Sequence, residues 1–170
     1  MQLRLERRAS PVGPLLIVTD EAGTLRALDF ADYEERMHKL LGRHYGAYEL
    51  VEGAAPASVA EALDAYFAGD VTAIEKLPTA TGGTEFQRAV WKALREIPAG
   101  TTQSYGALAA RLGKPGASRA VGLANGSNPV GIVVPCHRVI GANGTLTGYA
   151  GGMKTKAWLL EHERRHAQAA

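Results

Sequence analysis

The chain has 170 residues, a single cysteine and a formal net charge of +2. This length allows one ordinary domain, or one domain that carries a smaller one, with enough burial to fold without disulfides. One cysteine excludes an internal disulfide, the apolar runs fall far short of the ~20 residues of a membrane span, and no basic-then-apolar leader is visible, so we expect a cytoplasmic protein with no membrane partner.

The charges are unevenly distributed along the chain. Residues 1–83 carry 8 Lys+Arg against 13 Asp+Glu, whereas residues 84–170 carry 11 against 4. No acidic residue occurs from position 97 to position 160. Clustered Lys and Arg supply the sequence-independent part of nucleic-acid binding, so the second half is expected to meet a polyanion; the alternative is a solvated basic face.

The first half has the pattern of a small α+β domain. Strand-like runs joined by short turns indicate an antiparallel sheet. A helix should follow, with Asp32 as N-cap and Glu35 completing a capping box. The expected strands cover residues 3–8, 14–20, 24–30 and 47–52, and the expected helices residues 32–46 and 56–68. Residues 69–83 have the Pro, Thr and Gly content of a linker, which places the domain boundary between 83 and 84.

The second half opens with a helix over residues 84–97, capped by Thr84 with Gln87 as its capping-box partner. Two short helices, 104–112 and 117–125, then flank a glycine-containing turn, which is the helix-turn-helix pattern. In the second of these helices the small residues surround one long cation, Arg119, so its backbone could approach a groove closely. The small residues are Ser118, Ala120, Gly122 and Ala124.

The segment "VVPCHRVIG", residues 133–141, holds the only cysteine. We expect the longer run "GIVVPCHRVIG", residues 131–141, to be a buried strand interrupted by Pro135, with Cys136 at the bend and its thiol facing a pocket. A hairpin with its turn at Asn143-Gly144 and a glycine-rich loop should follow, and then a helix over 153–167 that buries Trp158 and carries Glu163.

The neighbours of Cys136 suggest chemistry, although a lone cysteine is often a small buried hydrophobe. A thiol needs a base or a positive environment to become a nucleophilic thiolate. His137 and Arg138 follow directly, and Glu163 is the candidate to orient the imidazole because the acid-free stretch leaves almost no other carboxylate nearby. No metal motif or phosphate-binding glycine loop occurs, so neither a metal nor a small-molecule cofactor is expected.

These residues carry a resemblance to a known family. "PCHRVIG", preceded by "SNPVGIVV" and followed by "GTLTGYAGG" and "AWLLEHE", resembles the active-site region of the O6-alkylguanine-DNA alkyltransferases. The likeness covers nearly all of residues 84–163 and is looser before them. It implies an α+β chain: a ribonuclease-H-like domain (1–83), then a mostly helical, winged-helix-like domain with a helix-turn-helix (84–170). It also implies double-stranded DNA with alkylated bases as partner, and we expect a monomer.

The resemblance also implies catalytic roles. Cys136 would accept the alkyl group irreversibly, His137 would act as base through a water, and Glu163 would hold His137. Asn128 would brace the turn beneath the site, and Tyr105 would give a proton to the departing purine.

Further positions would contact DNA or the base. Arg119 would replace the extruded base in the duplex, the carbonyls of Cys136 and Val139 would accept from the guanine amino group, and Tyr149 would form a pocket wall. Ser118, Ala120, Gly122 and Arg138 complete the expected DNA-binding set.

One position departs from the family pattern, because Ala150 stands where some members have a serine that can contact the base oxygen. We therefore expect tolerance of O4-alkylthymine or of bulkier alkyl groups. Two other readings remain open. A cysteine hydrolase would need an oxyanion hole and turnover. A non-catalytic module that senses alkylated bases would bind DNA without changing Cys136.

Overall fold

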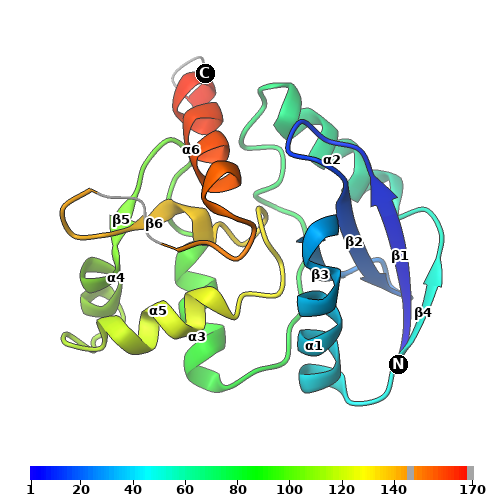
Figure 1. Ribbon diagram of the computed structural model, residues 1–170, viewed down its shortest axis with the longest axis horizontal. Coiled ribbons are helices and arrows are strands. Elements are labelled where there is room, and N and C mark those ends of the chain that lie inside the picture. The colour runs from blue at the N-terminus through cyan, green and yellow to red at the C-terminus, as the bar shows by residue number, and fades with distance from the viewer. Residues whose placement is uncertain (145–147, 168–170) are drawn as a thin grey trace. The chain divides into compact units, whose positions relative to one another are not determined.

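The computed structural model describes residues 1–144 and 148–167, which divide into two units (Figure 1). The first unit comprises Met1–Gly83 together with Pro129–Val133. The second comprises Thr84–Asn128 and the described residues from Val134 onward. The division after residue 83 lies at the predicted linker, but the sequence does not predict that five residues of the second half belong to the first unit.

The first unit is built on a four-stranded sheet in the order β3-β2-β1-β4. β1 (Gln2–Arg8), β2 (Leu15–Asp20) and β3 (Leu25–Phe30) pair antiparallel. β4 (Glu49–Glu52) pairs parallel with β1, with Leu3 opposite Leu50. The sheet is therefore mixed and not antiparallel throughout, because the chain crosses over through a helix between β3 and β4 and enters β4 in the direction of β1.

That crossover helix, α1 (Glu34–Tyr45), supplies part of the core of the unit. Its buried Met37 and Leu41 cluster with inward side chains of the sheet, among them Leu3, Leu16 and Ala27. The expected Asp32 cap is wrong: Ala31–Tyr33 form a tighter 3-10 turn, η1, and α1 begins after Tyr33 with no side-chain cap. In this turn the backbone N–H of Glu34 donates to the carbonyl of Ala31, an i→i+3 bond, where the capping box would have used side chains.

The second helix, α2 (Ala57–Ala68), follows Pro56 and ends at Gly69, whose φ of 120° suits a residue without Cβ. The segment that follows is packed and not a bare linker. Val71, Ile74 and Leu77 are buried, and Leu25 forms a bridge with Thr79. The buried apolar side chains of this Pro- and Thr-rich stretch therefore pack residues 71–79 onto the first unit.

Residues 131–134 form a turn and not the first part of the buried strand predicted for residues 131–141. Leu28 of β3 donates its N–H to Pro129 O and accepts from Gly131 N, each at 2.9 Å. Ile132 then has a φ of 67°, a left-handed conformation that no strand contains and that β-branched residues rarely adopt. The chain therefore turns here.

The second unit is mostly helical, and the α+β fold class expected for the chain is confirmed. α3 (Glu85–Leu94) has the predicted capping box between Thr84 and Gln87. β5 (Gln103–Ser104) leads into α4 (Tyr105–Arg111), capped by Ser104, and α5 (Ser118–Gly126) follows a short turn. Trp91 Nε1 donates to Ala124 O at 2.8 Å, which ties α3 to α5.

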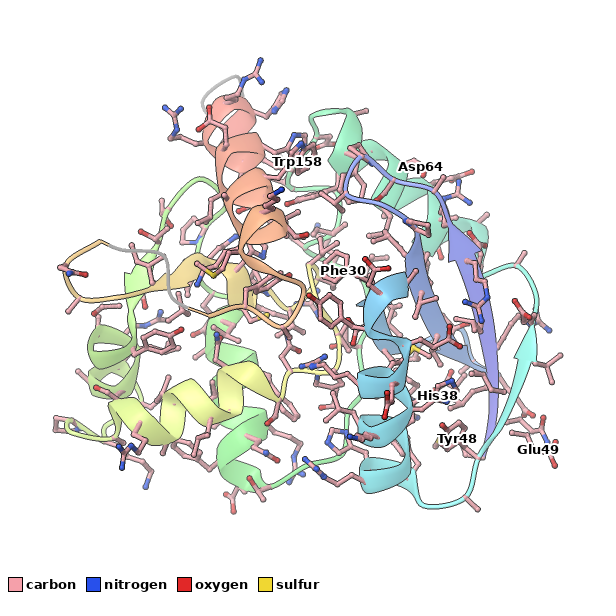
Figure 2. All side chains as sticks on the ribbon, in the orientation of Figure 1. Phe30, His38, Tyr48, Glu49, Asp64 and Trp158 are labelled. Carbon is pink, nitrogen blue, oxygen red and sulfur yellow. The ribbon has the colours of Figure 1, made fainter. Side chains whose placement is uncertain are left out.

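The nucleophile segment and the last helix complete this unit. η2 (Cys136–Arg138) is a 3-10 turn, β6 (Val139–Ile140) pairs parallel with β5, and α6 spans Met153–Ala167 as predicted. Trp158 of α6, labelled in Figure 2, is half-buried and not buried as expected, and it stacks on His162. The predicted hairpin of residues 142–152 falls partly outside the described residues, at 145–147; before them, Gly144 N donates to Gly141 O in a turn.

Within residues 1–144 and 148–167, none of the helices combines the length and the apolar character that crossing a membrane requires.

Candidate active site around Cys136

Cys136 begins the 3-10 turn η2, directly after Pro135, and is 6 % exposed. The sequence predicts a bent strand here, in which neighbouring side chains point to opposite faces. A 3-10 turn has about three residues per turn, so the side chains of Cys136 and His137 do not point to opposite faces as they would in a strand. His137 is fully buried.

A carboxylate holds His137, as the sequence suggested. The imidazole Nε2 lies 2.8 Å from Glu163 Oε2 of α6. An ionised carboxylate only accepts hydrogen bonds, so Nε2 carries the proton and Nδ1 keeps its lone pair. Among the described residues Nδ1 has no hydrogen-bond partner. The nitrogen that can take a proton is therefore the one turned away from Glu163.

Glu163 is fully buried and stays ionised because the Arg138 guanidinium pairs with it. Burial alone would raise the pKa of its carboxyl, but the electrostatic attraction and hydrogen bonds from His137 and Arg138 more than offset this and hold that pKa far below its usual value. The pair of Glu163 with Arg138 is bidentate, with Nε to Oε1 and Nη2 to Oε2 both at 2.8 Å.

This arrangement corrects the expectation that Arg138 is one of the DNA-binding residues. The guanidinium is buried, and its third hydrogen bond runs from Nη1 to Ile97 O at 2.7 Å. A cation engaged on three sides inside the second unit is not available to a phosphate. Sequence reasoning missed this because adjacent basic residues look alike whether they face solvent or a buried acid.

Two asparagines brace the backbone on either side of the nucleophile. Asn128 is buried, and its Nδ2 donates to Val134 O at 2.8 Å, which is where a residue bracing the turn would lie. Asn125 of α5 donates from Nδ2 to the carbonyl of Cys136 at 3.3 Å. Sequence reasoning did not single out Asn125, because a residue before Gly126 at a helix end looks like a terminus marker.

Lys156 of α6 was also missed. It is fully buried, and its Nζ donates to Val139 O at 2.7 Å. Burial lowers the pKa of Lys156, and negative charge on Cys136 opposes that shift. The signal was present in the sequence, because Lys156 precedes Glu163 by two helical turns and so shares its face.

The predicted pocket residues Tyr149 and Ala150 are both half-buried. The Tyr149 ring stands edge-on to the His137 ring, with centroids 6.5 Å apart and an interplanar angle of 85°. Tyr149 therefore lies beside the imidazole. Ala150 follows in a turn, where it brings no side-chain donor.

The α4–α5 pair holds the remaining predicted residues. Tyr105, the first residue of α4, is half-buried, and a Cβ at Gly122 would lie 3.8 Å from its ring, so the partly exposed Gly122 lies against Tyr105. Arg119 and Ala120 are exposed, and Ser118 is partly so. Leu123, one turn after Arg119, is 70 % exposed, which adds a large apolar side chain to a face predicted to be small.

No cluster of three or more His, Cys, Asp or Glu with the arrangement of a metal site occurs among the residues that the structure describes. In the first unit, His38 of α1 is engaged with Tyr48, whose Oη lies 2.6 Å from Nδ1; Figure 2 labels both side chains.

Comparison with known proteins identifies the family. Residues 6–81 match the family model of the 6-O-methylguanine DNA methyltransferase ribonuclease-like domain, and residues 85–165 match that of the DNA-binding domain of the same methyltransferases. The chain belongs to the 6-O-methylguanine DNA methyltransferase family. The two matched ranges meet at the segment where the sequence predicts a boundary.

Relatives in this methyltransferase family match over nearly the whole chain. A methylated-DNA–protein-cysteine methyltransferase of Shigella flexneri is 56 % identical over 165 residues, 96 % of each chain. One from Methanosarcina acetivorans is 47 % identical over 154 residues, which are 91 % of this chain and 94 % of the relative.

Solved structures of this family share the fold. The crystal structure of Mycobacterium tuberculosis OGT in complex with DNA superposes with a TM-score of 0.82, at 41 % identity, over 98 % of this chain and 94 % of that one. The O6-methylguanine-DNA methyltransferase of Pyrococcus kodakaraensis strain KOD1 gives a TM-score of 0.75 at 27 % identity, over 95 % and 98 %.

Proposed function

We propose that this chain repairs alkylated DNA by moving the alkyl group from O6 of guanine to the sulfur of Cys136, once per molecule. The chain is thus a methylated-DNA–protein-cysteine methyltransferase, as its relatives are named. The observation that carries the proposal is the buried Glu163–His137 pair placed directly beside the only cysteine of the chain. A structural cysteine needs no such pair.

The proton of the thiol leaves through His137. Glu163 fixes the tautomer with Nε2 protonated, so Nδ1 accepts the Cys136 proton through a bridging water and the imidazolium is stabilised by the carboxylate. Asn128 holds the turn before the nucleophile. The role of Glu163 is therefore to position His137, since it does not touch the reacting atoms.

The transfer is a displacement at a saturated carbon. The sulfur–carbon bond forms, the bond from carbon to the base oxygen breaks, and that electron pair stays on the purine, which Tyr105 protonates. A thioether does not release its alkyl group, and no second cysteine exists in the chain to attack it. Each protein molecule is consumed by one repair.

DNA binding is assigned to α5 of the second unit. Arg119 enters the duplex from the minor groove and fills the place of the extruded nucleotide, while the exposed Ala120 and partly exposed Ser118 allow close approach of the backbone. The M. tuberculosis relative was crystallised with DNA, which supports the same partner here. Gly122 contributes by admitting the Tyr105 ring, and Arg138 contributes through Glu163 and not through DNA.

The pocket is formed by Tyr149 with the carbonyls of Cys136 and Val139 as acceptors for the base. Because Ala150 offers no hydroxyl to the base oxygen, O4-alkylthymine and longer alkyl groups are secondary substrates. We further propose that the protein acts in the cytoplasm as a monomer without a metal or organic cofactor.

A titration tests the proposal. Increasing amounts of a duplex with one O6-methylguanine are mixed with a fixed amount of protein, and restored guanine is counted after digestion. Repair should stop at one base per protein molecule. Binding without any restored guanine would favour a sensing module, and continued turnover would exclude consumption of the protein.

A further inference from the structure

Both carbonyls assigned to base recognition already accept a hydrogen bond from a side chain. Asn125 Nδ2 donates to Cys136 O at 3.3 Å, and Lys156 Nζ donates to Val139 O at 2.7 Å. A carbonyl oxygen keeps a second lone pair, so each can accept one more donor, but the first donor restricts the direction of approach. Each of these carbonyls therefore has one lone pair left to accept a hydrogen bond from an entering base.

The other end of the Asn125 carboxamide is not in use. Asn125 is 6 % exposed, and within the part of the chain that the structure describes its Oδ1 is buried and accepts no hydrogen bond. Buried acceptors are nearly always paired, so an exception calls for a functional explanation. Asn125 lies on the inner face of α5 with the buried Val121 and Ala124, and its Nδ2 fixes the carboxamide against the nucleophile's own carbonyl.

The route of the substrate leads past this group. Cys136 is itself 6 % exposed, so an alkyl carbon can reach its sulfur only if the base enters the interior. The Cys136 carbonyl and the Asn125 carboxamide are one hydrogen bond apart. A base whose alkyl group meets the sulfur therefore comes near the Asn125 carboxamide.

We propose that Asn125 Oδ1 accepts a hydrogen bond from the exocyclic amino group of the extruded guanine, as a third acceptor beside the carbonyls of Cys136 and Val139. This inference rests on the proposed function and adds a specificity-determining residue to it. O6-alkylguanine has no hydrogen on N1, so its amino group is the donor on that edge. O4-alkylthymine has no N–H there, so Asn125 favours guanine lesions and opposes the tolerance that Ala150 allows.

The experiment compares two duplexes that differ by one group. One contains O6-methylguanine and the other O6-methylhypoxanthine, which lacks the amino group, and the single-turnover rate of methyl transfer is measured with each. Asn125→Leu removes the acceptor at similar shape. We expect the wild-type preference for guanine to fall about tenfold in this variant, as for a lost hydrogen bond at a buried site.

Two further variants control the interpretation. Ser127→Ala, two residues along the same helix end, removes only a hydroxyl that donates to Leu123 O and should leave the preference unchanged. Asn125→Ala repeats the test without the added bulk of leucine, in case the leucine does not fit. Folding of each variant is checked by circular dichroism before its rates are compared.

The rate of Cys136 alkylation by iodoacetamide distinguishes recognition of the base by Asn125 from structural support of the site by Asn125. This reagent alkylates the thiol without a base entering the pocket. An unchanged guanine preference in both Asn125 variants, or an equal loss with both duplexes and with iodoacetamide, would overturn the inference and leave Asn125 as a brace. If the wild-type chain transfers methyl from neither duplex while iodoacetamide still reacts, the proposed function itself fails and the inference falls with it.

Discussion

At the scale of single residues, Glu163 connects catalysis to stability, because one carboxylate serves both His137 and Arg138. Replacing it by glutamine keeps the shape but leaves a buried guanidinium without its counter-charge. We expect Glu163→Gln to lower the free energy of unfolding by about 3 kcal/mol. Urea unfolding at neutral pH measures this loss. A stability equal to that of the wild type would show that the ion pair is not formed in the folded chain.

The same carboxylate predicts a pH dependence. The pKa of Glu163 is lower in the folded chain than in the unfolded one, so the unfolded state takes up the proton first. Its stabilising contribution is complete above the unfolded pKa of about 4.3 and declines as the pH falls below that value. The stability gap between wild type and Glu163→Gln should therefore narrow in acid. A gap that widened below this pH would contradict the assignment.

Two arginines that look alike in sequence should behave differently. Arg119→Ala should reduce the slope of log affinity for duplex DNA against log salt by about one, since an exposed cation near phosphates releases a counterion. Arg138→Met should leave that slope unchanged and destabilise the fold, because Arg138 is buried against Glu163. The reverse pattern, read from fluorescence anisotropy at several salt concentrations, would restore Arg138 to the DNA surface.

At the scale of elements, one of the two predicted capping boxes forms and the other does not. The box at Thr84 is present at the start of α3, whereas α1 has no side-chain cap. Thr84→Ala should cost about 1 kcal/mol of stability, because Thr84 Oγ1 accepts from Gln87 N. Asp32→Ala should change stability by less than about 0.5 kcal/mol, because Asp32 makes no cap bond and is exposed. Equal losses in denaturant titrations would mean that α1 begins at Asp32 after all.

The helices of the second unit follow from sequence because their signals are local. Capping residues and apolar spacing predict α3, α4, α5 and α6, although α3 ends at Leu94 and not at the predicted Ile97. The segment before Cys136 is different. Its run of Val and Ile favours a strand, yet Ile132 takes a left-handed conformation and the chain turns. Contacts with Leu28, distant in sequence, decide this backbone, and no local pattern records them.

The same distinction holds in the site. His137 and Glu163 could be paired from sequence because a long acid-free stretch left few candidates. The spacing of Lys156 and Glu163 places both on one face of α6, but the hydrogen bonds of Asn125 and Lys156 do not follow from sequence, since they depend on which backbone carbonyls these side chains reach. For Arg138, the sequence carries no sign that its side chain is buried, so a DNA-binding role is the natural prediction.

At the scale of the whole molecule, the two units do not divide the sequence at a single point, because residues 129–133 belong to the first unit. Val130, Ile132 and Val133 of the second half are buried as members of the first unit. A fragment of residues 84–170 should therefore expose apolar surface, bind the dye ANS and aggregate on size exclusion. Val130→Ser with Ile132→Asn should reduce both effects. A fragment that is monodisperse and does not increase ANS fluorescence would show that residues 84–170 fold without burying residues 129–133 against the first unit.

The central claim is that Cys136 accepts an alkyl group from DNA and retains it as a thioether. The basic second half of the chain and its single cysteine both support this claim. Intact-protein mass spectrometry after mixing the chain with excess duplex containing O6-methylguanine tests this directly, beside a Cys136→Ser control. The account predicts one added methyl group on the wild type, located on Cys136 by peptide mapping, and none on the control. An unchanged wild-type mass despite tight binding would contradict it and make the protein a damage-binding module.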